Sequence, residues 1–152
     1  MDKKERILVT GGHGFLGSAL CRSLKEKGYE NVIIFRSQDY DLTREKEVAK
    51  LFEEKGQFDV VIHLAGSIGG ISFFKENPGR AYYENLIMNT LMLEYSRRNN
   101  VSKFIGIGSV LSYPHDTPIP FMEENLWQGP LDKDTASYGM AKLSMLWQSQ
   151  TY

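Results

Sequence analysis

Residues 7–20 read ILVTGGHGFLGSAL, a short aliphatic run that ends in glycines and continues into a helix-like stretch. Gly12, Gly14 and Gly17 satisfy the pattern G-x-G-x-x-G, and Gly11, Gly14 and Gly17 satisfy G-x-x-G-x-x-G. Between a strand and a helix, such glycines allow a tight turn, the close approach of a pyrophosphate and packing of the helix on the strand. The N–H groups that open the helix then face the phosphates. The segment therefore predicts a dinucleotide site.

Strand-like and helix-like stretches alternate along the rest of the chain. We expect strands at Ile7–Thr10, Val32–Phe35, Val60–Leu64 and Phe104–Ile107. We expect helices at Gly14–Lys27, from Thr43 as a capping residue to about Lys55, at Arg80–Arg98, and from about Ala136 to the chain end. This alternation predicts the α/β class, with a Rossmann-like, doubly wound parallel sheet and helices on both faces. Functional residues should gather beyond the carboxyl ends of the strands.

The composition narrows the class of protein. The 152 residues suit one compact domain, and 41% hydrophobic with 24% charged residues is ordinary for a globular protein. A net charge of −1 offers no basic field for a nucleic acid, and no apolar run is long enough to cross a bilayer. Cys21 is the single cysteine, and no His, Cys and Asp cluster has metal-ligand spacing. We expect a cytoplasmic protein that binds neither nucleic acid, membrane nor metal.

The residues at the end of the second expected strand indicate whether the cofactor is NAD or NADP. An NAD site places Asp or Glu there to bond the ribose 2′-hydroxyl, whereas this chain has Phe35-Arg36-Ser37. The forked, cationic Arg36 side chain suits a 2′-phosphate. We therefore expect NADP, as NADPH, in preference to NAD.

A reactive set is spread over the second half of the chain. Tyr138 and Lys142 form Y-x-x-x-K, and residues four apart share one helix face. The ammonium is expected to lower the pKa of the phenol, which can then exchange a proton with an alcohol or ketone oxygen. Ser109, just after the fourth strand, can hydrogen-bond the same oxygen.

Five segments, TGGHGFLG, VVIHLAG, YYENL, GSVLSYP and SYGMAK, occur in an order typical of a known family. With them the chain resembles the extended short-chain dehydrogenases, the NAD-dependent epimerase/dehydratase family, over nearly its whole length. HLAGSIGGI, the YP pair and WQGPL are most similar to the GDP-L-fucose synthase subfamily, the GDP-4-keto-6-deoxymannose epimerase-reductases. The resemblance implies an NADP-dependent oxidoreductase that acts on a GDP-4-keto-6-deoxy sugar.

The resemblance also implies roles for single residues. The catalytic set is Ser109, Tyr138 and Lys142, and Asn85 matches an asparagine typical of the helix after the third strand. Cofactor contacts are implied at Gly11, Gly14, Phe15, Leu16, Gly17, Arg36, Asp41, Leu42, Leu64, Ala65, Gly66, Tyr138 and Lys142. Members of the family commonly form a homodimer through the helices that correspond to Arg80–Arg98 and Ala136–Tyr152.

The chain departs from the subfamily in two ways. Leu111 stands where the subfamily has a cysteine that serves in epimerisation with a later histidine, whose position lies beyond Tyr152. Leucine neither gives nor takes a proton, so the reductase half of the reaction is supported and the epimerase half is not. The family also continues into a smaller C-terminal substrate domain. We expect residues 1–152 to form the dinucleotide-binding domain alone, a chain that can be inactive in isolation.

Two other functions stay open at this point. The first is another nucleotide-sugar 4-epimerase or dehydratase, although a dehydratase usually has Asp-Glu near the serine, where this chain has Val110 and Leu111. The second is a non-catalytic fragment that binds a dinucleotide. His63, within an apolar strand, is predicted to be structural. His115, in a proline-rich loop on the expected substrate side, is a further catalytic candidate beside the serine, tyrosine and lysine.

Overall fold

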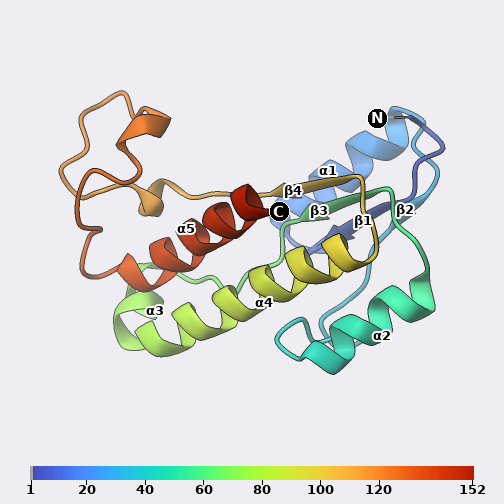
Figure 1. The fold of residues 1–152 in the computed structure, drawn as a ribbon, viewed down its shortest axis with the longest axis horizontal. Coiled ribbons are helices and arrows are strands. Elements are labelled where there is room, and N and C mark those ends of the chain that lie inside the picture. The colour runs from blue at the N-terminus through green and yellow to red at the C-terminus, as the bar shows by residue number, and fades with distance from the viewer. Residues whose placement is uncertain (1) are drawn as a thin grey trace.

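The computed structural model describes residues 2–152. Their sheet has parallel strands in the order β2-β1-β3-β4 (Figure 1). The strands are β1 (Ile7–Thr10), β2 (Val32–Ile33), β3 (Val60–His63) and β4 (Lys103–Gly106). Because β1 connects outward to β2 while β3 lies on its other side, the strand order reverses between β1 and β3. This reversal is the switch point where ligands bind in open α/β sheets.

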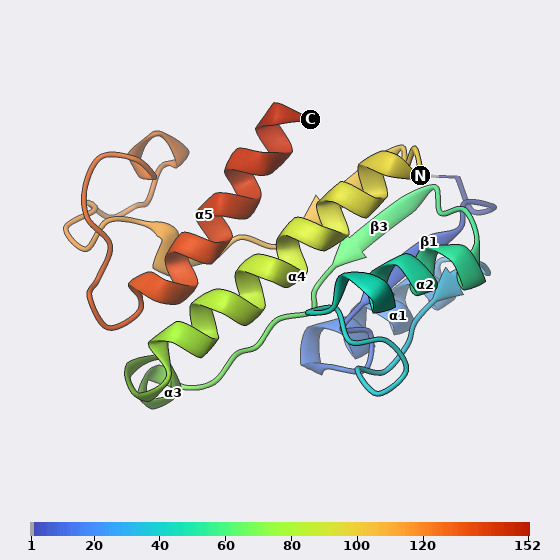
Figure 2. The same ribbon diagram turned by 60° about the horizontal axis from the view of Figure 1, so that its bottom comes forward.

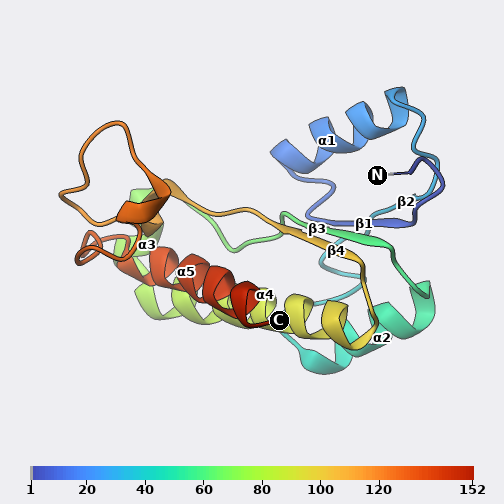
Figure 3. The same ribbon diagram turned by 45° about the horizontal axis from the view of Figure 1, so that its top comes forward.

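Helices cover both faces of the sheet, which confirms the expected doubly wound α/β fold. They are α1 (Phe15–Glu26), α2 (Glu45–Lys55), α3 (Ile71–Glu76), α4 (Pro78–Arg98) and α5 (Ala136–Thr151). In Figure 3, α1 lies on one side of the strands, and α2 and α4 lie on the other. In Figure 2, α5 runs beside α4, and the segment that joins β4 to α5 loops away from the sheet.

The core follows the alternation of side chains along the strands. Ile7, Val9, Val60 and Ile62 pack with Leu24 of α1 on one face. The opposite face carries Leu8 and Val61, which pack against buried side chains of α2 and α4: Val48, Leu51, Phe52, Met88, Leu91 and Met92. Both faces of β1 and β3 are therefore buried, as expected for a central pair of parallel strands.

The second strand is shorter than the sequence predicts. It ends at Ile33, because Phe35 turns out of the sheet and packs edge-on against Tyr40, with ring centroids 5.4 Å apart. Phe35 is buried in this new position, whereas Ile34 is partly exposed. The apolar run therefore predicted the position of the strand but overstated its length.

The expected cap of the second helix is wrong. The residue that precedes α2 is Arg44, and it has no side-chain cap. The Thr43 hydroxyl instead donates to Asp41 Oδ1 at 2.7 Å, and the Thr43 amide donates to the same oxygen at 3.0 Å. A local bond between neighbouring polar side chains has replaced the cap.

The glycine turn brings the start of α1 very close to the end of β1. Gly11 has φ +68°, a conformation that favours glycine, and its carbonyl oxygen accepts the Gly14 amide at 2.9 Å. A Cβ at Gly17 would overlap that same Gly11 oxygen. Glycine at position 17 is therefore required for α1 to start directly over the turn.

Candidate active site

A cavity of about 770 Å³ lies at the switch point, within the size range of ligand pockets. Residues that follow β1, β2 and β3 line it. They include every residue expected to contact a cofactor outside α5: Gly11, Gly14, Phe15, Leu16, Gly17, Arg36, Asp41, Leu42, Leu64, Ala65 and Gly66. The structure therefore brings together segments that are far apart in the sequence.

The part of this cavity formed by the glycine turn is suited to phosphate groups. The first N–H groups of a helix have no hydrogen-bond acceptor within that helix. In α1 these groups begin at Phe15, and this end of the helix is open, since the Phe15 side chain is almost fully exposed. No acidic residue lies in its first turn to oppose an anion. At Gly11 an added Cβ would lie 2.9 Å from the Ala65 nitrogen, so two loops meet with no room for a side chain. This cradle fits a dinucleotide pyrophosphate.

Arg36 lies at the rim of the same cavity, on the loop that follows β2. Its amide donates to Asp39 Oδ2 at 2.9 Å, while within residues 2–152 no ion pair or hydrogen bond engages its guanidinium. Asp41 is held in the loop by Thr43 and by Arg44, whose Nε lies 3.2 Å from Asp41 Oδ2. The bonds from Thr43 lower the pKa of Asp41, so its charge is balanced locally. The Arg36 cation is left available to a ligand.

The loop after β3 is held from both sides. The Leu64 and Ala65 amides each donate to Thr10 Oγ1 at 3.1 Å. Asn85 of α4 accepts from the Ser67 amide at 3.0 Å and donates to the Ser67 carbonyl at 2.8 Å. Asn85 is buried, so its position in the helix fixes the floor of the cavity by two reciprocal hydrogen bonds.

Tyr138 and Lys142 lie one turn apart near the start of α5. Lys142 Nζ lies over the Tyr138 ring, 5.7 Å from its centroid. Phe74 of α3 stacks on the Tyr138 ring, and the two ring centroids are 5.1 Å apart. Lys75, next in α3, forms a 2.9 Å ion pair with Asp134, just before α5. Helix α3 thus holds Tyr138 in place.

Burial shifts the pKa of both members of this pair. It raises the pKa of Tyr138 and lowers the pKa of Lys142. The expected depression of the phenol pKa by Lys142 is therefore wrong for the chain in this form, because desolvation is the cause that acts on Tyr138. At neutral pH the phenol keeps its proton and can act as a proton donor.

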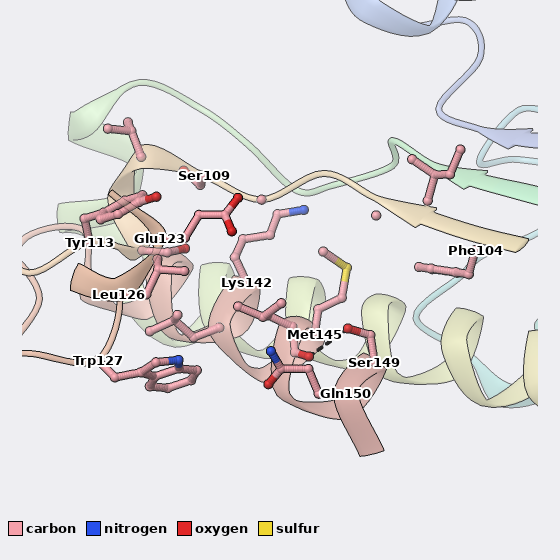
Figure 4. A pocket seen from close by; sticks show the side chains of 17 residues that line it. Phe104, Ser109, Tyr113, Glu123, Leu126, Trp127, Lys142, Met145, Ser149 and Gln150 are labelled. Atoms are coloured by element: carbon pink, nitrogen blue, oxygen red, sulfur yellow. Dashed lines mark hydrogen bonds between the residues drawn. The ribbon is translucent and has the colours of Figure 1, made fainter. Parts of the chain in front are cut away.

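Ser109 reaches the site from the end of β4. It precedes a short 3-10 turn, Val110–Ser112, and its Oγ accepts the Leu111 amide at 3.1 Å. Ser109 and Lys142 line a second cavity, of about 760 Å³, and Figure 4 shows the Lys142 side chain reaching from α5 toward the strands. A Cβ at Gly139 would overlap the Leu111 carbonyl, so α5 packs directly on the serine turn.

His63 is structural, as its place in the strand predicts. It is fully buried, with Nδ1 2.8 Å from Thr10 Oγ1 and Nε2 3.1 Å from Asn89 Oδ1. Burial, and then the charge of Lys142, lower the pKa of His63 to about 3. The lysine is therefore close enough to β3 to influence its last residue.

His115, in contrast, is exposed, and its Nδ1 lies 2.8 Å from Asp116 Oδ1. It lines neither the cavity of Ser109 nor the cavity of the glycine turn. Cys21 of α1 packs at the edge of the core, and burial raises the pKa of its thiol, which suits a small core residue. These positions give no support to a catalytic role for either side chain.

Other contributors carry no signal in the sequence that would have revealed them. Helix α3 has only six residues, too few for a periodic pattern, so the contact of Phe74 with Tyr138 was not expected. Glu123 lines the cavity of Ser109 from a distant turn. In the sequence, Asn89 is one of many polar residues on a long helix. Only its hydrogen bond to His63 in the structure shows that it has a specific partner.

Residues 2–152 contain neither a metal-binding cluster nor a membrane-spanning helix. No group of three or more His, Cys, Asp or Glu side chains is arranged to hold a metal ion. None of the helices in the same range has the length and apolar character needed to cross a membrane.

The glycine turn lies at the switch point, Ser109 and Lys142 line one cavity after β4, and Tyr138 lies one turn before Lys142 but lines neither cavity. This arrangement is that of a dinucleotide-binding fold of the short-chain dehydrogenase class. The chain belongs to the NAD dependent epimerase/dehydratase family, whose model matches residues 7–152. This confirms the family that the motifs indicated.

Known members of the family are similar to the chain over nearly all of its length. A GDP-L-fucose synthase of Sinorhizobium fredii is 39% identical over 149 residues, which are 97% of this chain and 46% of the relative. A GDP-L-colitose synthase of Yersinia pseudotuberculosis is 32% identical and covers 91% of this chain and 44% of its own length. MlghC, a GDP-mannoheptose C4 reductase of Campylobacter jejuni solved with NADP bound, has a TM-score of 0.95 at 30% identity, with all of this chain and 48% of MlghC covered. The chain thus spans about half the length of these proteins.

The buried histidine generates a prediction about acid stability. Because the pKa of His63 is about 3 in the folded chain and about 6.5 when unfolded, only the unfolded state binds this proton between those values. The free energy of unfolding should therefore fall as the pH drops from 6.5 toward 3, by up to about 1.4 kcal/mol per pH unit from this group. Urea titrations at several pH values would measure it.

His63→Gln should remove this component, so its stability should depend less on pH in that window than that of the wild type. His115→Gln is the matched control, since it removes an exposed histidine and should leave the loss in place. Parallel pH profiles for wild type and His63→Gln would contradict the assignment.

Proposed function

We propose that the chain carries out NADP-dependent reduction of the 4-keto group of a GDP-linked 4-keto-6-deoxy sugar. The observation that carries the proposal is that Lys142 lines one cavity with Ser109 and lies beside Tyr138, whose phenol keeps its proton, in a fold that also holds the cavity of the glycine turn. Further support comes from the relatives, which include synthases of GDP-L-fucose and GDP-L-colitose and a GDP-mannoheptose C4 reductase. These proteins are about twice as long as the chain, so turnover by the chain itself is also proposed.

The cofactor supplies the hydride when it is bound. The residues of the chain act on the ketone oxygen: the Tyr138 phenol gives it a proton, and the Ser109 hydroxyl donates a hydrogen bond that holds it. Lys142, whose Nζ lies 5.7 Å from the centroid of the Tyr138 ring, would donate a hydrogen bond to the nicotinamide ribose. The raised pKa of Tyr138 suits the reductive direction, because a protonated phenol is needed at the start.

We infer that the reaction proceeds without epimerisation. Epimerisation requires a group that removes and returns a proton at a carbon beside the ketone. Leu111, two residues after Ser109, offers only its backbone, and its amide is already bonded to Ser109 Oγ. The sugar would therefore keep its configuration at the carbons that flank the ketone.

We propose NADPH as the cofactor because of the free guanidinium at the cavity rim. NADPH should bind more tightly than NADH, by about tenfold or more, since a charge-assisted pair with the 2′-phosphate is added. Arg36→Ala should remove most of this preference and affect NADH little. Fluorescence titrations of both variants with both cofactors would measure it, with Arg22→Ala on the outer part of α1 as a control. Equal affinities in the wild type would overturn this choice.

Turnover tests the reaction itself. Oxidation of NADPH, followed at 340 nm with GDP-4-keto-6-deoxymannose, should be slowed by about a hundredfold or more in Tyr138→Phe, which keeps the ring but loses the proton. Cofactor binding should survive in the variant. In D₂O no solvent deuterium should enter the carbons beside the ketone. A wild-type chain that binds NADPH without oxidising it would contradict reduction by this chain, and deuterium uptake would contradict the role of Leu111.

We also propose that the chain forms a homodimer through α4 and α5. Met140 and Trp147, seven residues apart on α5, are exposed apolar side chains on one face of the helix. Sedimentation velocity should give a dimer that Met140→Glu converts into a monomer, because the charge would be buried in the interface. A monomeric wild type at high concentration would exclude this interface.

A further inference from the structure

A series of buried hydrogen bonds crosses the molecule from the cavity of the glycine turn to α5. The Leu64 and Ala65 amides donate to Thr10 Oγ1, which lies 2.8 Å from His63 Nδ1. His63 Nε2 is 3.1 Å from Asn89 Oδ1, and Asn89 Nδ2 donates to the Ala141 carbonyl at 3.2 Å. Thr10, His63 and Asn89 are at most 1% exposed. We call these three residues the buried relay.

The relay admits one arrangement of hydrogens. Asn89 uses its Nδ2 to donate to Ala141, so its Oδ1 must accept, and His63 must carry its proton on Nε2. His63 Nδ1 is then an acceptor, and the Thr10 hydroxyl donates to it. The Thr10 oxygen remains free to accept the Leu64 and Ala65 amides. Every polar group of the three side chains named here thus has a matched partner, and a change at one end alters what the other end can bond.

One end of the relay lies on residues of the proposed cofactor site, and the other end adjoins residues that the proposed reaction uses. Leu64 and Ala65 line the cavity of the glycine turn. Ala141 directly precedes Lys142 and lies one turn beyond Tyr138 on α5. The carbonyl of a residue inside a helix already accepts from the residue four positions later, so the bond from Asn89 is an additional one that ties α5 to α4.

We propose that His63 and Asn89 are positioning residues, which hold α5 with Tyr138 and Lys142 in register with the loop that lies against the cofactor. The inference rests on the proposed NADP site, because the loop at one end is assigned to that site. Neither side chain lines the cavity of Ser109 or the cavity of the glycine turn, so they act through the residues that they hold and not on the substrate.

The test uses reciprocal variants at the two ends of the relay. Asn89→Leu keeps the volume at the α5 end and removes both of its hydrogen bonds. Thr10→Val keeps the shape at the loop end and removes the hydroxyl. Leu93→Ala, one turn along the same face of α4 from Asn89, is the control for a general loss of packing, because Leu93 is buried but has no side-chain hydrogen bond in the described residues.

Each variant is read at the end that it does not touch. Asn89→Leu should speed amide hydrogen exchange at Leu64 and Ala65 by about tenfold, the equivalent of one lost hydrogen bond, beyond any increase in Leu93→Ala. Thr10→Val should shift the titration of Lys142, followed by NMR of labelled lysine and assigned through its loss in Lys142→Met. NADPH should bind about tenfold more weakly to both variants and within about twofold of wild type to Leu93→Ala.

The outcomes separate the relay from the proposed function. The positioning role would be overturned if the changes in amide exchange and Lys142 titration stayed at the mutated end. It would also be overturned if Leu93→Ala, with the same loss in free energy of unfolding, gave the same changes. A wild-type chain that fails to bind NADPH would instead defeat the proposed function, and exchange at Leu64 and Ala65 would still decide whether the two ends are coupled.

Discussion

The structure depends on the close approach between the Gly11 carbonyl and the backbone of Gly17. A side chain at position 17 cannot occupy that space, so the first turn of α1 rests directly on the end of β1. This contact directs the helix N-terminus into the switch point between β1 and β3. The cavity for a dinucleotide therefore depends on the absence of a side chain at position 17. The loop at Ala65 packs equally closely, against Gly11.

The sequence predicted those features that follow from local pattern. The glycine spacing and the apolar runs located the strands, the main helices and the glycine turn, because each is a short-range consequence of backbone geometry. The cavity-lining residues Asp41, Leu42, Leu64, Ala65 and Gly66 were expected only from the resemblance to the family. The approach of Phe74 to Tyr138 could not be predicted in this way, since α3 is too short to show a period and its partner lies 64 positions later. The bond between His63 and Asn89 likewise joins two elements whose relation is set by tertiary packing.

The protonation of the reactive pair shows where pattern alone misled. Four-residue spacing puts Tyr138 and Lys142 on one face, and a nearby ammonium is expected to lower the phenol pKa. Here both groups are withdrawn from water, so desolvation raises the pKa of Tyr138 and lowers the pKa of Lys142, which favours the neutral form of each. The resulting phenol is a proton donor, and Leu111 supplies no second acid or base. Reduction is the chemistry that these residues support best.

The central claim is that this fold binds NADPH along the glycine turn, with the 2′-phosphate at Arg36. The most direct measurement is a ¹⁵N–¹H correlation spectrum of the chain with NADPH and with NADH. The account predicts that both cofactors shift the amides of Phe15, Leu16 and Ala65, and that the difference between the two spectra centres on Arg36 and Ser37. Shifts confined to the opposite ends of the strands, or a difference that spares Arg36, would contradict it.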